Sequence, residues 1–514
     1  MEQSRKIARH ASVVALATLV SRGLGFLRDA TVAFALGAGP LADAFFVAFR
    51  IPNVLRRLFA EGSMTMSFIP VFSRLRSEQG QATAFAMARS AMLWLLAVVG
   101  GITLLGEICA WPIVAAIAPG FSDDPERFAF TVGLVRICFP YILCISAVAL
   151  CMGILNSLEH FLAPALSPIW LNVTLILAAL VGHFSGLDVA VCLSVGVLAG
   201  GVVKWLTQQK HLKRLGFSWR GERSWSHPGV RRMGLLMLPT LFGAAVYQIN
   251  TLVVTLLASF LPAGSISALF YADRLVEFPL GVFGLAVSTA ALPSLSRLWA
   301  EGRQEDFSGA LCSSMSLTLF IALPSMAGFL ALAEPMVSLL FGRGRFGPEA
   351  VAATSSALLA FSAGLPFTAL ARPLVGGFYA RENTRTPVLV ATACLVVNLS
   401  LGALLMRPLG HAGLALAVSA SSAANFLILH WLMRRELSSY RLPRGTILRI
   451  AGLSALVWAG AWASARLGLL WLPAIPVLAA AYVLAGRALG LEEARLFWDM
   501  VKSRLLRSRA EPSA

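Results

Sequence analysis

The chain has 514 residues, of which 58% are hydrophobic and only 13% are charged, and its formal net charge is +17. Soluble domains carry roughly 25% charged residues, so this chain has too few charges to cover a surface that faces water. The composition excludes an ordinary soluble enzyme, a disordered chain and a nucleic-acid-binding domain. It favours a protein that crosses a membrane many times.

Apolar segments long enough to cross a bilayer recur from the N-terminus to residue 490. The sequence does not show the regular alternation of apolar and polar residues that is typical of a β-barrel. Because one span needs roughly 20 residues of helix, it predicts an all-α polytopic membrane protein with about fourteen transmembrane helices. In chain order, the predicted spans are approximately 12–36, 41–75, 84–116, 128–155, 161–182, 187–207, 230–260, 265–296, 308–333, 350–379, 386–406, 411–433, 447–467 and 471–490.

Basic residues gather in alternate loops between these spans. The loops on the side of both termini hold roughly five times as many Lys and Arg residues as the opposite loops, and the most basic one runs from Lys210 to Arg232. The positive-inside rule then predicts that both termini are cytoplasmic. The same bias accounts for most of the positive net charge without a nucleic-acid partner.

A short motif recurs six spans apart. Residues 69–75 read IPVFSRL and residues 292–298 read LPSLSRL, and each copy closes a span that carries charges. Copies of the same orientation predict two six-helix lobes related by a parallel repeat, with a substrate site between them. The predicted parts are an N-terminal lobe (1–215), a C-terminal lobe (216–440), a terminal helix pair (441–490) and a basic cytoplasmic tail (491–514).

Charges inside the predicted spans concentrate in the first, second and eighth spans. A charge at mid-helix costs roughly 2.5–3.5 kcal/mol on insertion scales, so such residues usually line a water-filled pathway. Arg22 and Asp29 are seven residues apart and share one helix face, with Arg28 beside them. In the eighth span Arg274 and Glu277 are three residues apart, which allows them to pair.

The second span predicts a charged stripe, because Asp43, Arg50 and Arg57 recur every seven residues. Glu61 lies four residues beyond Arg57 and can pair with it. Pro52 interrupts the hydrogen bonds of this helix, so the register beyond it stays open and Arg56 is an alternative to Arg57. Basic residues outnumber acidic ones in the first two spans, so the predicted cavity attracts an anion. The guanidinium fork suits phosphate and carboxylate groups.

Other charged residues support less specific interpretations. Arg136, Lys204 and Arg372 lie near predicted span ends, where we expect them to reach the membrane surface. The alternative for the whole charged set is a group of ion pairs that lock helices together, although buried pairs are poor stabilisers. The seven Cys and seven His residues form no CxxC or HExxH pattern, so the sequence predicts neither a metal site nor a cofactor.

Three long motifs carry a resemblance to a known family. They are residues 21–29 (SRGLGFLRD), 43–53 (DAFFVAFRIPN, continued by LRRLFAEG at 55–62) and 271–279 (YADRLVEFP). The chain resembles the MurJ/MviN family of lipid II flippases, within the multidrug/oligosaccharidyl-lipid/polysaccharide exporter superfamily. The resemblance covers nearly the whole chain. It implies fourteen helices, arranged as two six-helix lobes and a terminal pair.

The resemblance also implies a function. The substrate would be lipid II, the undecaprenyl-diphosphate-linked peptidoglycan precursor, moved by alternating access from the inner to the outer leaflet of the bacterial cytoplasmic membrane. Lipid II, membrane lipid and the cell-wall synthesis machinery are the expected partners, without nucleic acid or cofactor. The alternatives are another polyprenyl-linked glycan flippase or a multidrug exporter of the superfamily. A cation exporter should have an acid-rich cavity, and the excess of arginine counts against it.

By the family's pattern, the functional residues of the cavity are Arg22, Arg28, Asp43, Arg56 and Arg274. We expect Asp29, Asp43 and Glu277 to orient these arginines or to contact sugar and peptide groups, and Asn53 to belong to the substrate-binding residues. The stripe argument favours Arg50 and Arg57, whereas the resemblance favours Arg56. A bend of the helix at Pro52 would reconcile the two.

Overall fold

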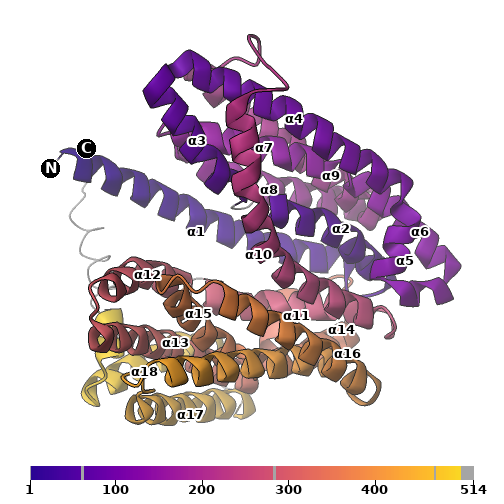
Figure 1. Cartoon of the computed structure of the whole chain (residues 1–514). Coiled ribbons are helices and arrows are strands. Elements are labelled where there is room, and N and C mark those ends of the chain that lie inside the picture. The colour runs from indigo at the N-terminus through magenta and orange to yellow at the C-terminus, as the bar shows by residue number, and fades with distance from the viewer. Residues whose placement is uncertain (1, 60–62, 282–284, 468–470, 499–514) are drawn as a thin grey trace, which may run out of the picture. The chain divides into compact units, whose positions relative to one another are not determined.

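The computed structural model describes residues 2–59, 63–281, 285–467 and 471–498. Its secondary structure in these ranges is helical, which confirms the predicted all-α class (Figure 1). The helices are α1 (Glu2–Leu36), α2 (Pro40–Phe59), α3 (Ser63–Gln79), α4 (Gln81–Ile108), α5 (Ala110–Ile117), the 3-10 helix η1 (Pro119–Asp123), α6 (Pro125–Cys138), α7 (Tyr141–Ser157), α8 (Leu162–Ser185), α9 (Val189–Arg214), α10 (Pro228–Ala258), α11 (Ser265–Pro279), α12 (Leu285–Ala300), α13 (Gln304–Phe341), α14 (Pro348–Ser362), α15 (Leu365–Ala380), α16 (Arg385–Glu436), α17 (Arg444–Arg466) and α18 (Trp471–Ala488).

Many of these helices are suited to a membrane. Among the described residues, eight helical segments are long and apolar enough to cross one, or nine if the pair α14 and α15, bent by 45°, counts as one span. Helix α16 covers two predicted spans, because Gly410 breaks its helical geometry with φ 57° and ψ −136°. The polytopic character is therefore confirmed, and the number fourteen stays a prediction.

The chain folds into two compact units. The first contains residues 1–267 and 341–350, and the second contains residues 268–340 and 351–514. The division predicted from the repeat, with its boundary at residue 215, stays a prediction. Most of the predicted basic tail, from residue 499 onward, lies outside the described residues.

In the first unit, α8 packs along both α1 and α9, and α7 packs against α9, α3 and α4 (Figure 1). Small residues allow α8 and α9 to approach closely. A Cβ atom added at Gly196 would lie 2.6 Å from the Cβ atom of Ala178, and one at Gly200 would lie 2.6 Å from the hydroxyl oxygen of Thr174. The GxxxG spacing of α9 therefore serves packing between helices of one chain.

The segment 341–350 belongs to the first unit because it binds the end of α1. The backbone N–H of Arg345 donates to the carbonyl oxygen of Phe34 at 2.9 Å. Gly37 and Gly344 have φ angles of +77° and +63°, and a Cβ atom at either position would lie within 2.5 Å of a backbone oxygen. Both positions therefore require glycine.

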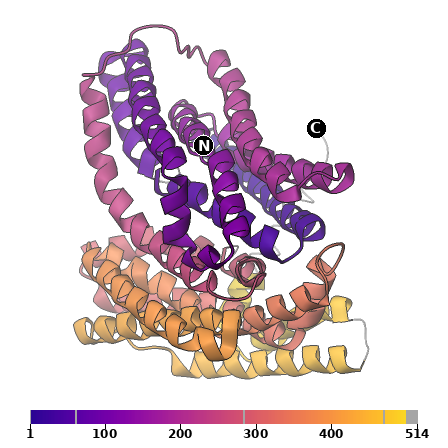
Figure 2. The ribbon, with the colours of Figure 1, turned by 90° about the vertical axis from the view of Figure 1, so that its right-hand side faces the viewer.

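In the second unit, the terminal helices α17 and α18 lie side by side and pack on α13 (Figure 2). The contact includes a specific hydrogen bond. Pro324 has no N–H group, so the carbonyl oxygen of Phe320 lacks its usual donor within α13. The hydroxyl of Tyr482 donates to that oxygen at 2.8 Å, which ties α18 to α13 at a defined position.

Candidate functional site

Arg28 is held on the face of α1 that meets α8. Its Nε and Nη2 atoms donate to Asp29 Oδ1 at 2.9 and 2.6 Å, and its Nη1 atom donates to Asn172 Oδ1 at 3.0 Å. The amide of Asn172 in turn donates to the carbonyl oxygen of Ser21 at 3.1 Å. The side chains of Arg28 and Asp29 are 15% and 9% exposed, so the guanidinium is both oriented and largely buried.

Arg56 is oriented by a neutral neighbour on its own helix. Its Nε and Nη2 atoms donate to Asn53 Oδ1 at 3.1 and 2.8 Å. An amide oxygen fixes the guanidinium without cancelling its charge. Arg50 and Arg57 are half-buried on the same helix, whereas Glu61, the predicted partner of Arg57, lies outside the described residues.

Lys204 on α9 completes a cationic cluster with Arg28 and Arg56. Its side chain is 4% exposed, and the charges that act on it are those of Arg56 and Arg28. The expectation that Lys204 reaches the membrane surface is therefore wrong. The physical reason is that α9 continues to Arg214, which is ten residues beyond Lys204 and about 15 Å along the helix axis.

Two buried neutral side chains, one on α7 and one on α9, have unused hydrogen-bonding capacity. Tyr141 is fully buried, its ring lies against Gly201 one turn before Lys204, and it feels the charges of Arg56 and Arg28. Within the described part of the chain its hydroxyl has no partner, and neither polar atom of the Gln208 side chain has one. Such groups are rare in native interiors and call for an explanation.

The sequence interpretation did not include Lys204, Tyr141 or Gln208 in the site. A usable signal existed for two of them, because Lys204 and Gln208 are four residues apart and share a helix face. Polar residues in that register within an apolar helix point toward the protein interior. Tyr141 has no comparable signal, because one tyrosine after a proline is common at the start of a helix.

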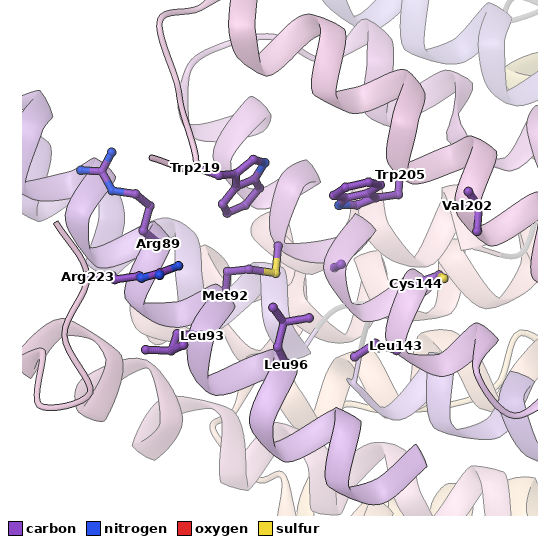
Figure 3. A pocket seen from close by; sticks show the side chains of 11 residues that line it. Arg89, Met92, Leu93, Leu96, Leu143, Cys144, Val202, Trp205, Trp219 and Arg223 are labelled. Carbon is purple, nitrogen blue, oxygen red and sulfur yellow. The ribbon is translucent and has the colours of Figure 1, made fainter. Parts of the chain in front are cut away.

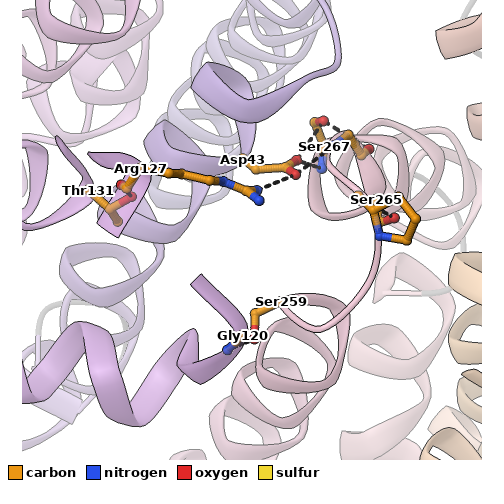
Figure 4. A network of polar contacts seen from close by, with 9 residues as sticks. Asp43, Gly120, Arg127, Thr131, Ser259, Ser265 and Ser267 are labelled. Atoms are coloured by element: carbon orange, nitrogen blue, oxygen red, sulfur yellow. Dashed lines mark hydrogen bonds and ion pairs between the residues drawn. The ribbon is translucent and has the colours of Figure 1, made fainter. Parts of the chain in front are cut away.

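Asp43 lies in a different environment, a buried polar network within the first unit (Figure 4). Its carboxylate is 1% exposed and accepts four hydrogen bonds. Arg127 Nη2 donates at 2.9 Å, the Gly264 N–H at 2.7 Å, and the N–H and hydroxyl of Ser267 at 2.7 and 2.8 Å. The guanidinium of Arg127 also lies 3.7 Å from the ring centre of Phe121.

The network joins the start of α2 to the start of α6 and to the turn before α11. All four contacts fall on the two carboxylate oxygens, so they favour a structural role for Asp43 in this conformation. Its predicted role in substrate binding stays a prediction. The sequence interpretation did not include Arg127 in the site, because no sequence spacing links residues 84 positions apart.

The second unit contains the remaining predicted pair. Arg274 Nη1 lies 2.9 Å from Glu277 Oε2, as the spacing of three residues predicted, and the two side chains are 27% and 36% exposed. The guanidinium of Arg274 also lies 4.9 Å from the ring centre of Phe270. Arg372 is half-buried and donates to the carbonyl oxygen of Leu280 at 2.9 Å, and its expected extension to the membrane surface stays a prediction.

The remaining basic residues of the predicted spans differ in exposure. Arg22 is half-buried on α1, six residues before Arg28, and Arg136 on α6 is exposed. No group of three or more His, Cys, Asp or Glu side chains within the described ranges could hold a metal ion. The groups available for binding around Lys204 are therefore guanidinium, ammonium, hydroxyl and amide groups.

Comparison with known proteins identifies the family. The family described as "Lipid II flippase MurJ" matches residues 32–482. The chain belongs to the MurJ family. It is 38% identical over 472 residues to a probable lipid II flippase MurJ of Vibrio cholerae, covering 88% of this chain and 89% of that protein. It is 36% identical over 427 residues to the lipid II flippase MurJ of Burkholderia cenocepacia, covering 82% of each chain.

Solved structures agree with this family assignment. A lipid II flippase MurJ in an inward closed conformation superposes with a TM-score of 0.79 at 26% identity, covering 93% of this chain and 99% of that one. An inward-facing multidrug resistance transporter of the MATE family superposes with a TM-score of 0.69 at 14% identity, covering 82% and 95%. The chain thus shares its fold with MATE transporters, and at 14% identity this likeness shows the fold alone.

Proposed function

We propose that this MurJ family member transports lipid II from the inner to the outer leaflet of the bacterial cytoplasmic membrane. The observation that carries the proposal is the cationic cluster of Arg28, Arg56 and Lys204 in a chain of this family, in which Lys204 is buried and the two arginines are half-buried. Asp29 offsets one of these charges through its ion pair with Arg28. The excess of basic groups is costly in a protein interior unless a ligand of opposite charge compensates it. The diphosphate of lipid II has that charge.

The cluster suits a diphosphate chemically. Arg28 and Arg56 present planar forks, already oriented by Asp29, Asn172 and Asn53, that form paired charge-assisted hydrogen bonds to phosphate oxygens. Lys204 adds a compact positive charge. The hydroxyl of Tyr141 and the amide of Gln208 are neutral donors that a bound headgroup would engage.

The other predicted residues have supporting roles in this proposal. Arg22 and Arg274 are further basic contacts for the headgroup, and Glu277 orients Arg274. Asp29 and Asn53 orient Arg28 and Arg56, and Asp43 holds the helices that carry the cluster. Lobes 1–215 and 216–440 rock about the bound headgroup, and the terminal pair 441–490 supports the lipid tail. Both termini and the basic tail face the cytoplasm.

Depletion and complementation in the host test the proposal. After depletion, lipid II should accumulate in the inner leaflet, and expression of the wild-type chain should restore its outward movement. Expression of the Arg28→Ala variant at a normal level in the membrane should not restore it. An unchanged distribution of lipid II between leaflets after depletion would remove the assignment. Loss of the variant protein from the membrane would support the alternative that the charges only lock helices.

A further inference from the structure

A pocket of about 330 Å³ opens within the first unit, between α4, α7 and α9 (Figure 3). Its walls are apolar and come from all three helices, including Met92, Leu96, Ala147 and Val202. The volume is at the lower end of the roughly 300–1,000 Å³ range of small-molecule sites. Leu96 and Val202 are 46% and 40% exposed, so the pocket opens to the surroundings beside apolar side chains.

One end of the pocket is basic and one side is aromatic. Figure 3 shows Arg89 and Arg223 at the same end, with Trp205 and Trp219 along one side. None of the eleven lining residues carries a carboxylate. Arg223 is exposed on the loop between α9 and α10. The pocket therefore combines an apolar interior with a positively charged mouth.

The loop that carries Arg223 is fixed on α4, so the mouth is already formed. The Nε and Nη1 atoms of Arg89 donate to three loop carbonyl oxygens, those of Ser218, Arg220 and Glu222, at 2.9–3.2 Å. The loop also accepts a hydrogen bond from the indole N–H of Trp94, at the carbonyl oxygen of Trp225. A preformed site loses less conformational entropy when it binds a ligand.

The surroundings place the mouth at a membrane interface. Trp94 and Trp225 form an exposed edge-to-face pair beside it, and such aromatic side chains favour the depth of the lipid headgroups. The segment from Lys210 to Arg232, which includes the end of α9, the loop and the start of α10, carries seven Lys and Arg residues and one Glu. Basic segments at this depth attract anionic lipids at about 1 kcal/mol per basic residue.

We propose that this pocket binds one acyl chain of an anionic diacyl phospholipid, with the headgroup phosphate against Arg223. The apolar walls match methylene groups, and the basic mouth matches the phosphate. If each methylene group occupies about the 30 Å³ of a water molecule in the liquid, the pocket holds roughly ten of them. That length fits part of an acyl chain and is too short for an undecaprenyl tail.

Tryptophan quenching by brominated lipid tests the proposal on the full chain. The protein is reconstituted in phosphatidylcholine vesicles that contain a minor fraction of phosphatidylglycerol, and bromine atoms are placed on the acyl chains of one lipid or the other. Because the chain has 12 tryptophans, the Trp205→Phe variant isolates the signal of Trp205. We expect Trp205 to be quenched at about fivefold lower mole fraction by brominated phosphatidylglycerol than by brominated phosphatidylcholine.

Two matched pairs of variants locate the site. Arg223→Gln should remove the roughly fivefold preference for phosphatidylglycerol, whereas Arg220→Gln, three residues away and outside the pocket lining, should retain it. Val202→Phe fills the pocket and should reduce Trp205 quenching, whereas Val195→Phe, which is exposed on the same helix outside the lining, should not. These variants change exposed side chains, so folding should be preserved.

Three results would overturn the proposal. One is equal quenching of Trp205 by the two brominated lipids. Another is unchanged quenching after Val202→Phe, which would place the lipid outside the pocket. The third is displacement of brominated phosphatidylglycerol by millimolar inorganic phosphate, which would show that the site selects a free anion and not a lipid headgroup.

Discussion

Replacement of Asp43 by Asn should destabilise the first unit strongly. The amide can keep the two hydrogen bonds from Ser267 through its oxygen, but its NH₂ group then faces two donors, Arg127 Nη2 and the Gly264 N–H. Removing one partner of a buried ion pair costs about 3–5 kcal/mol. Because half of the hydrogen bonds survive, we expect a loss of about 3 kcal/mol, at the lower end of that range.

Thermal unfolding of the purified protein in detergent, followed by the loss of its size-exclusion peak, measures the effect. Asp188→Asn is the matched control, because the Asp188 side chain caps the exposed start of α9 by accepting from the Val191 N–H, and Asn caps a helix about as well as Asp. The Asp43→Asn variant should unfold several degrees lower, and the control should not change. Equal midpoints for the two variants would refute the assignment of Asp43 to a structural network.

Three further predictions follow from buried groups. Lys204→Met should lower lipid II transport about tenfold while thermal stability is unchanged or raised, because it removes a buried basic group that lies near Arg28 and Arg56. Loss of folded protein would contradict this. Tyr482→Phe should leave the carbonyl oxygen of Phe320 without a donor and lower the stability of this contact by about 1–3 kcal/mol. Proteolysis within α17 and α18 should then be faster than in the wild type, and equal proteolysis would contradict the prediction. Burial lowers the pKa of His227 below 6.5, so its neutral ring, which accepts from the Gly229 N–H, is favoured in the folded loop. The unfolded loop binds the proton more readily, so amide-exchange protection of residues 216–230 should be complete above pH 6.5 and fall below it, and His227→Asn should remove this dependence.

The fold class and the charged helices were predictable from the sequence. The scarcity of charged residues identifies a membrane protein. The charged residues in otherwise apolar segments identify α1, α2 and α11 as helices that carry candidate site residues. The spacing of three residues between Arg274 and Glu277 gave their ion pair correctly. These inferences need only local composition and helical periodicity, and both can be obtained from a single sequence.

The contacts of the candidate site were harder to predict. Residues i and i+1 of a helix usually point apart, so the ion pair of Arg28 with Asp29 has no pattern in the sequence. The partner of Asp43 lies on α6, and only the folded chain brings Arg127 to it. Lys204 was misplaced because hydropathy ends a predicted span at the first polar residues, whereas α9 continues through them.

In the proposed function, the cationic cluster of Arg28, Arg56 and Lys204 binds the headgroup of lipid II. The most direct measurement is the movement of fluorescent lipid II between the leaflets of vesicles that contain the purified chain. Arg28→Gln and Arg56→Gln should each lower the rate about tenfold or more, because each removes charge-assisted hydrogen bonds to the diphosphate. Arg136→Gln makes the same change of charge at an exposed site and should transport at the wild-type rate. Wild-type rates in both cluster variants, or an equal loss in all three, would contradict the account.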